Sequence, residues 1–159
     1  MLFRSHQLEN KRPDVQVTSE NILDRTGLEP VVTEEGVRVN IRVAIGYMNE
    51  WLGGNGHVAL ENQLEDVSTA EICRSQIWQW IRHEVTLDNG QQLTSRLVER
   101  YLGEELAGME RRADDHFDEA VEIFRETALG EEFAEFLTMP AYTDHLVDRV
   151  SKPTEAFVA

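Results

Sequence analysis

The chain has 159 residues, and 15 Lys and Arg against 30 Asp and Glu give it a net charge of −15 at pH 7. This length suits a single domain with its own hydrophobic core. The acidic balance argues against binding to nucleic acid and to anionic membranes, because both need a basic protein surface. The one cysteine excludes an intrachain disulfide, and no apolar run approaches the roughly 18 residues that cross a bilayer.

The first part of the chain predicts a tail followed by two helices. Residues 1–17 are polar and show no period, which is typical of a linker or interdomain tail. Thr18 caps a short helix that Gly27 closes. Thr33 begins a longer helix, which ends at Gly53. One apolar stripe at three- and four-residue steps marks the inward side of this second helix: Val37, Ile41, Ala44, Ile45, Met48 and Leu52.

The middle of the chain predicts an irregular segment and then a third helix. Residues 57–66 show no helical period and predict an extended loop. The helix is expected to begin at Ser68 or Thr69. Its buried side is predicted to carry Ala70, Cys73, Ile77, Trp80 and Ile81. The position of Cys73 on this apolar side favours a buried structural thiol over a nucleophile.

Three more helical segments and a last turn are predicted over residues 94–106, 114–124, 131–139 and 144–150. Asp114-Asp115 caps the second of these segments, and Pro140 ends the third. No segment alternates as a half-buried strand does. The sequence therefore predicts an all-α fold, a bundle of about five helices. The helical domain is expected over residues 18–150, with a flexible tail over 151–159.

Asp66 is the candidate for chemistry, since it follows the irregular segment and comes just before a helix. One interpretation is a helix N-cap, for which Asp is among the best residues. The other is a carboxylate at the end of a loop, available as a general base. Arg74 follows about two helical turns later and could pair with Glu65 or Asp66 to hold the loop. Periodicity alone leaves both interpretations open.

Other residues that could carry chemistry have ordinary structural explanations. The five histidines are scattered, and none pairs at i, i+4 as a metal-binding helix requires. The glycines at 53, 54 and 56 come after a helix, so they predict a C-cap and turn rather than a phosphate loop. Trp78 and Trp80 point to different faces of their helix. One is expected in the core and the other at an interface with a neighbouring domain.

The run from Leu64 to Ile81 closely resembles the signature of the malate synthases, A type. That signature reads Met-Glu-Asp, two small residues, Thr-Ala-Glu-Ile-Ser-Arg, and then Gln-x-Trp-Gln-Trp-Ile. The chain has Leu64-Glu65-Asp66 at its start and Gln76-Ile77-Trp78-Gln79-Trp80-Ile81 at its end. Residues 7–15, 36–56 and 136–142 are similar to three other segments of the family. The resemblance spans about residues 6–148 and is more specific than any short motif.

The resemblance implies an enzyme that condenses acetyl-CoA with glyoxylate and hydrolyses the product to malate and CoA. The family carries a (β/α)8 barrel, which holds Mg²⁺ and an arginine that polarises the enolate, and a helical C-terminal domain that closes over its mouth. The aspartate that removes the acetyl methyl proton falls on Asp66, with Glu65 and Arg74 in support. A barrel alone takes about 250 residues. The chain is therefore expected to be the C-terminal part of such an enzyme, inactive without the barrel and holding no metal ligand itself.

The segment 57–64 departs from the family pattern, which usually has Cys at His57, Pro at Ala59 and Tyr at Glu61. A negative charge at Glu61 is expected to raise the pKa of Asp66. Three alternatives follow: a catalytic lid within a longer enzyme, a helical interaction module that has lost catalysis, and a lid supplied to a separate barrel chain. A cytoplasmic location is expected, because the last residues lack the Ser-Lys-Leu peroxisomal signal of some relatives.

Overall fold

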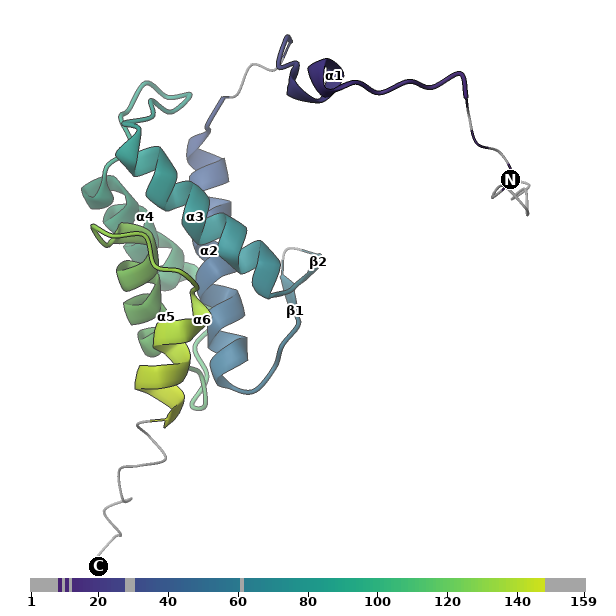
Figure 1. Ribbon diagram of the computed structural model, residues 1–159. Coiled ribbons are helices and arrows are strands. Elements are labelled where there is room, and N and C mark those ends of the chain that lie inside the picture. The colour runs from purple at the N-terminus through teal and green to yellow at the C-terminus, as the bar shows by residue number, and fades with distance from the viewer. Residues whose placement is uncertain (1–8, 10, 12, 28–30, 61, 148–159) are drawn as a thin grey trace, which may run out of the picture. The chain divides into compact units, whose positions relative to one another are not determined.

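The computed structural model describes residues 9, 11, 13–27, 31–60 and 62–147 (Figure 1). The chain divides into two units, Met1–Pro30 and Val31–Ala159. The first unit contains α1 (Ser19–Leu23), which begins with a capping box between Thr18 and Asn21. Helix α1 belongs to this N-terminal unit and not to the main helical domain, whose predicted bounds of 18–150 included it. The predicted tail over 151–159 lies outside the described residues.

The second unit is helical, which confirms the predicted all-α fold (Figure 1). Two of its helices continue into short π-helices. The helices are α2 (Glu34–Leu52), α3 (Val67–Arg82), α4 (Ser95–Gly108), α5 (Phe117–Phe124), π-helix η1 (Arg125–Leu129), α6 (Thr138–Pro140) and π-helix η2 (Ala141–Val147). Helix α2 is the centre of the unit, because α3, α4 and α5 all pack against it. The predicted last turn over 144–150 overlaps η2, and its final three residues are outside the described part.

The apolar stripe predicted for α2 is confirmed. All six of its residues are buried, and Tyr47, which the stripe did not include, is buried with them. The helix begins where predicted, because the Thr33 side chain accepts a hydrogen bond from the Gly36 amide at 2.9 Å. Thr94 caps α4 in the same way through the Leu97 amide, at 3.2 Å. These side-chain caps explain why the starts of both helices were predictable from single residues.

The segment predicted as a loop contains a β-hairpin, so the prediction that the chain has no strand is wrong. Strands β1 (Val58–Leu60) and β2 (Gln63–Glu65) pair antiparallel. Asn62, in the connection between them, has a φ of 64°, a left-handed conformation that asparagine tolerates. The hairpin lies close to α2, since a Cβ atom added at Gly46 would be 3.1 Å from the Leu60 side chain. Strands of three residues are too short to show a period of two in the sequence.

The helix predicted over 131–139 is also wrong. The chain has no regular structure from Gly130 to Leu137, and the next helix begins at Thr138. Pro140 is the last residue of α6, but the chain stays helical beyond it, because η2 follows directly at Ala141. Pro140 falls in the first turn, where a backbone N–H has no partner within the helix, so proline costs no hydrogen bond there. The N-cap position of α5 is His116, which makes no side-chain cap hydrogen bond, whereas Asp115 of the predicted pair accepts a hydrogen bond from the Phe117 amide at 3.4 Å.

Candidate functional site

Asp66 is the N-cap of α3, as one of the two sequence interpretations predicted. Its Oδ1 accepts hydrogen bonds from the Ser68 amide at 2.9 Å, the Thr69 amide at 3.3 Å and the Ser68 hydroxyl at 2.5 Å. None of the residues that the structure describes hydrogen-bonds to Oδ2. The cap and the general base are therefore compatible, since one oxygen closes the helix and the other is available to a substrate.

The surroundings of Asp66 lower the pKa of its carboxyl group. The largest cause is the hydrogen bond from the Ser68 hydroxyl, followed by the amide of Thr69, and the Ser68 amide and the charge of His57 add to it. The direction is opposite to the raised pKa expected from Glu61, a residue that lies outside the described part of the chain. Asp66 is thus ionised at neutral pH, as a proton acceptor must be.

The hairpin buries the side chain of Glu65, whereas that of Asp66 is half-buried. Glu65 pairs with Val58 in the ladder and is only 7% exposed. Leu64, one residue earlier, is 74% exposed.

Burial and, to a smaller extent, the charge of Glu65 raise the pKa of Cys73 to about 11. This thiol is buried, as predicted, and its raised pKa makes it a poor nucleophile.

Arg74 is 1% exposed and does not contact the predicted partners, Glu65 and Asp66. Its guanidinium instead forms an ion pair with Glu71 at 2.7 Å. It also donates to the backbone carbonyls of Thr127 at 3.4 Å and Glu135 at 3.3 Å. The predicted ion pair with the loop is therefore wrong. Arg74 joins α3 to η1 and to the irregular segment 130–137, whose carbonyl groups need donors.

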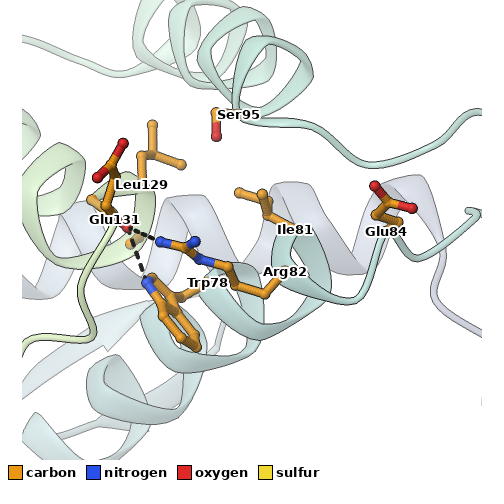
Figure 2. Close-up of a pocket in the computed structure, with 9 residues that line it drawn as sticks. Trp78, Ile81, Arg82, Glu84, Ser95, Leu129 and Glu131 are labelled. Atoms are coloured by element: carbon orange, nitrogen blue, oxygen red, sulfur yellow. Dashed lines mark hydrogen bonds between the residues drawn. The ribbon is translucent and has the colours of Figure 1, made fainter.

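Three further residues of α3 bind the same segment: Glu71 and Arg82, which the sequence did not single out, and Trp78, for which this contact was not predicted. Glu71 accepts a hydrogen bond from the Leu137 amide at 2.6 Å, and the Trp78 indole donates to the Gly130 carbonyl at 3.0 Å. Figure 2 shows the Arg82 guanidinium reaching that same carbonyl, at 3.3 Å. We call Glu71, Arg74, Trp78 and Arg82 the polar stripe of α3. Its spacing of three and four residues was a visible signal, because such residues share one helix face.

The tryptophans of α3 are both half-buried, and the one in contact with the core is Trp80. Trp80 packs against the larger core cluster. Trp78 lines a cavity of about 310 Å³ between α3, the start of α4 and the end of η1 (Figure 2). Its ring lies edge-on to Phe133, with centroids 5.0 Å apart.

The described residues do not fit a metal ion, since no group of three or more His, Cys, Asp or Glu among them comes together as a metal site needs. In the same part of the chain, no helix combines the length and apolar character of a membrane span.

Comparison with known proteins gives consistent results. Residues 31–145 match the family model described as malate synthase, C-terminal. The chain is 41% identical over 146 residues to malate synthase A of Escherichia coli (strain K12), covering 87% of this chain and 27% of that relative. It is 41% identical over 153 residues to the malate synthase of Myxococcus xanthus (strain DK1622), covering 89% and 28%. It is 36% identical over 139 residues to a glyoxysomal malate synthase of Candida tropicalis, covering 86% and 25%. The chain thus spans 25–28% of the length of these relatives.

Proposed function

The chain belongs to the malate synthase C-terminal family, and from this premise we propose that it is the catalytic lid of a malate synthase, with Asp66 as its base. The observation that carries the proposal is that the two oxygens of the Asp66 carboxylate differ in their hydrogen bonds. Oδ1 is fixed by the start of α3, while Oδ2 has no hydrogen-bond partner among the described residues. A base held in this way loses little freedom when a substrate arrives.

In the proposed reaction, Oδ2 of Asp66 takes a proton from the methyl group of acetyl-CoA. The electron pair of the broken C–H bond passes to the thioester oxygen as an enolate. The enolate carbon then adds to the aldehyde carbon of glyoxylate as the thioester carbonyl re-forms. The electron pair of the aldehyde C=O moves to its oxygen, which takes up a proton to become the hydroxyl group. Water then hydrolyses the thioester to give malate and CoA. Because the lowered pKa makes Asp66 a weak base, the enolate needs strong stabilisation from the opposite side. We assign that role to the barrel, which would also bind Mg²⁺.

Exposed apolar side chains beside Asp66 support docking against a barrel. Leu64 is 74% and Val67 is 39% exposed, and Ile72 lies further along α3 at 57%. Apolar residues around a catalytic carboxylate can exclude water when two domains meet. We therefore propose that the barrel covers this region and that the chain alone has no activity. A cytoplasmic location belongs to the same proposal, although the Candida tropicalis relative is glyoxysomal.

The alternative function is a helical interaction module without catalysis, and one observation favours it. Arg74 has a complete structural explanation, because its contacts hold η1 and the segment 130–137. Its presence in the signature therefore does not itself argue for chemistry. The two functions differ in a single requirement, which is an ionised carboxylate at position 66.

The deciding experiment measures thiol release from acetyl-CoA in the presence of glyoxylate and Mg²⁺. The chain is fused, or added, to a malate synthase barrel that lacks its own C-terminal domain. Asp66→Asn retains an N-cap side chain but loses the base, so we expect its rate to fall on the order of 100-fold or more. Asp114→Asn is the matched control, because Asp114 is 90% exposed and not near the cap.

Two outcomes would contradict the proposal. Full activity of Asp66→Asn would show that another group removes the proton. No activity of the unsubstituted fusion, in a sample where docking to the barrel is demonstrated, would favour the interaction module.

A further inference from the structure

Two of the three donors that hold the Asp66 carboxylate come from one residue, Ser68. Its backbone amide donates to Oδ1 at 2.9 Å, and its hydroxyl donates to the same oxygen at 2.5 Å. The third donor is the Thr69 amide, at 3.3 Å. An N-cap side chain needs only the backbone N–H groups of the first turn. The Ser68 hydroxyl is therefore an additional donor that the cap of α3 does not require.

These donors determine which oxygen of Asp66 can take up a proton. A protonated carboxyl group carries the proton on one oxygen and keeps the other as an acceptor. The amides of Ser68 and Thr69 are fixed in the first turn of α3, so a proton on Oδ1 would face N–H groups that cannot turn away. The proton therefore belongs on Oδ2, and Oδ1 can accept the same hydrogen bonds before and after proton transfer.

The hydrogen bond from the Ser68 hydroxyl depends on the charge of Asp66. Hydrogen bonds to an ionised oxygen are roughly twice as strong as those to a neutral one, and an O–H···O⁻ bond measures about 2.5–2.7 Å. The distance here, 2.5 Å, falls in that range. The same hydrogen bond is the largest cause that lowers the pKa of Asp66. Ser68 is exposed, so water competes for its hydroxyl and the effect is moderate.

The titratable groups around Asp66 come from other elements. After the hydrogen bonds of the cap, the charge of His57 lowers the pKa of Asp66 further. Burial and then the charge of Asp66 raise the pKa of Tyr47 in α2, so Tyr47 is neutral wherever a carboxyl group titrates. Glu65, the last residue of β2, is buried beside Asp66 in the chain. A substitution of Ser68 leaves these groups in place, because serine carries no charge.

We propose that Ser68 is a positioning residue for Asp66: its hydroxyl holds Oδ1, favours the ionised carboxylate and leaves Oδ2 as the oxygen that takes the proton. Its part in a reaction rests on the function proposed above, whereas its hydrogen bond to Asp66 can be measured without a barrel. Ser68 thereby keeps Asp66 ionised to a lower pH, and a variant without the hydroxyl should hold its proton more tightly.

The test is a ¹³C NMR titration of the Asp66 side-chain carboxyl in the complete chain, at low salt. Ser68→Ala removes the hydroxyl but keeps the backbone amide, so the cap of α3 is retained. We expect the titration midpoint of Asp66 to rise by about 0.3–1 pH unit in this variant. Ser68→Thr keeps a hydroxyl at the same position and should restore the midpoint. Ser75→Ala, the same substitution about two turns further along α3, should leave the midpoint unchanged.

The fusion to a barrel then tests the part that Ser68 plays in the reaction. The acidic limb of the pH profile of kcat/KM reports the pKa of the base in the free enzyme, so Ser68→Ala should move this limb to higher pH by the same amount. The proposal is overturned if the Asp66 midpoint stays unchanged in Ser68→Ala, or rises equally in Ser68→Thr. A midpoint that rises while the acidic limb stays in place would contradict the function proposed for Asp66, but not the hydrogen bond measured by NMR.

Discussion

The two oxygens of the Asp66 carboxylate have different surroundings. Oδ1 accepts two backbone amides and a hydroxyl, all from the first turn of α3. The sequence alone offered a cap and a base as competing interpretations of this residue. The structure shows that the cap uses one oxygen, and the base remains the proposal for the other. The sequence was therefore enough to predict Asp66 as a helix cap, whereas its role as a base needs separate evidence.

Substitutions at Asp66 should separate these two roles in stability measurements. Asp66→Ala removes the cap and should lower the Tm by about 2–4 °C, whereas Asp66→Asn should lower it less, because asparagine caps nearly as well. The lowered pKa adds a pH dependence. Its stabilisation is fully present above about pH 4, the ordinary range of Asp, and is lost as the pH falls through the lowered value. Thermal unfolding followed by circular dichroism, at neutral and acidic pH, measures both effects. Equal losses for the two variants would contradict the cap.

Cys73 should be protected from alkylation in the folded chain. Its pKa is raised to about 11, chiefly by burial. At about pH 8.5, we expect iodoacetamide to react on the order of 100-fold more slowly than with the chain unfolded in urea. Mass spectrometry of timed samples gives both rates. The control is the double variant Cys73→Ser/Gln79→Cys, whose thiol is exposed on the same helix and should react at an ordinary rate.

Two faces of helix α3 contact other parts of the chain, and only the apolar face was predicted. Its apolar face buries Ala70, Cys73 and Ile77, as the period of the sequence indicated. The polar stripe binds a segment about 50–66 residues away in the chain. Contacts over such distances leave no local pattern in the sequence. This explains why residues 131–139 were assigned to a helix, although of their apolar side chains Leu137 is buried while Phe133 and Phe136 are exposed.

The helix caps depend on local contacts and could be predicted, whereas the hairpin depends on a contact between distant residues and could not. Thr33 and Thr94 bond to amides three residues ahead, so the information lies within one turn. The hairpin depends on the close approach of Leu60 to Gly46, fourteen residues earlier, which no local propensity encodes. The family resemblance, and not periodicity, pointed to Asp66 as the functional residue. The hydrogen bonds of the site then became visible only in the structure.

Gly130 should be essential to the junction between η1 and the irregular segment. A Cβ atom there would lie only 2.4 Å from the Glu126 backbone oxygen. Gly130→Ala is therefore expected to lower the free energy of unfolding by about 1–3 kcal/mol. Gly103→Ala is the control, because a Cβ atom at this position in α4 meets nothing within 4 Å. It should raise the free energy of unfolding by about 0.5–1 kcal/mol. Urea unfolding measures both, and a stabilising Gly130→Ala would refute the steric argument.

The molecule combines a strongly acidic composition with exposed apolar side chains. Its net charge of −15 favours repulsion between copies. Part of the acidic surface is neutralised, as where Arg38 bridges Glu34, Glu104 and Glu105. The exposed apolar residues of the second unit include Leu64, Ile72, Phe133, Phe136, Met139 and Tyr142. Such residues need a partner surface, and the barrel proposed above would provide one.

The isolated chain should therefore self-associate and bind a hydrophobic dye. Association should increase with salt, which screens the repulsion between acidic copies. The double variant Phe136→Ser/Met139→Ser should reduce both dye binding and the sedimentation coefficient. Thr143→Ser is the control, because serine keeps the hydrogen bond that the Thr143 hydroxyl donates to the Met139 carbonyl. Analytical ultracentrifugation showing a monomer, together with no dye binding, would contradict this prediction.

The cap of α3 has a consequence for how this region can vary. Asp66 is fixed from its C-terminal side, by the helix that follows it, while the hairpin precedes it. Exchange of an exposed hairpin residue such as Leu64 is therefore expected to leave the carboxylate in place. The position of the Asp66 carboxylate and the surroundings of that carboxylate thus depend on different segments of the chain. The helix decides where the carboxylate stands, and the hairpin decides which charges and contacts it meets.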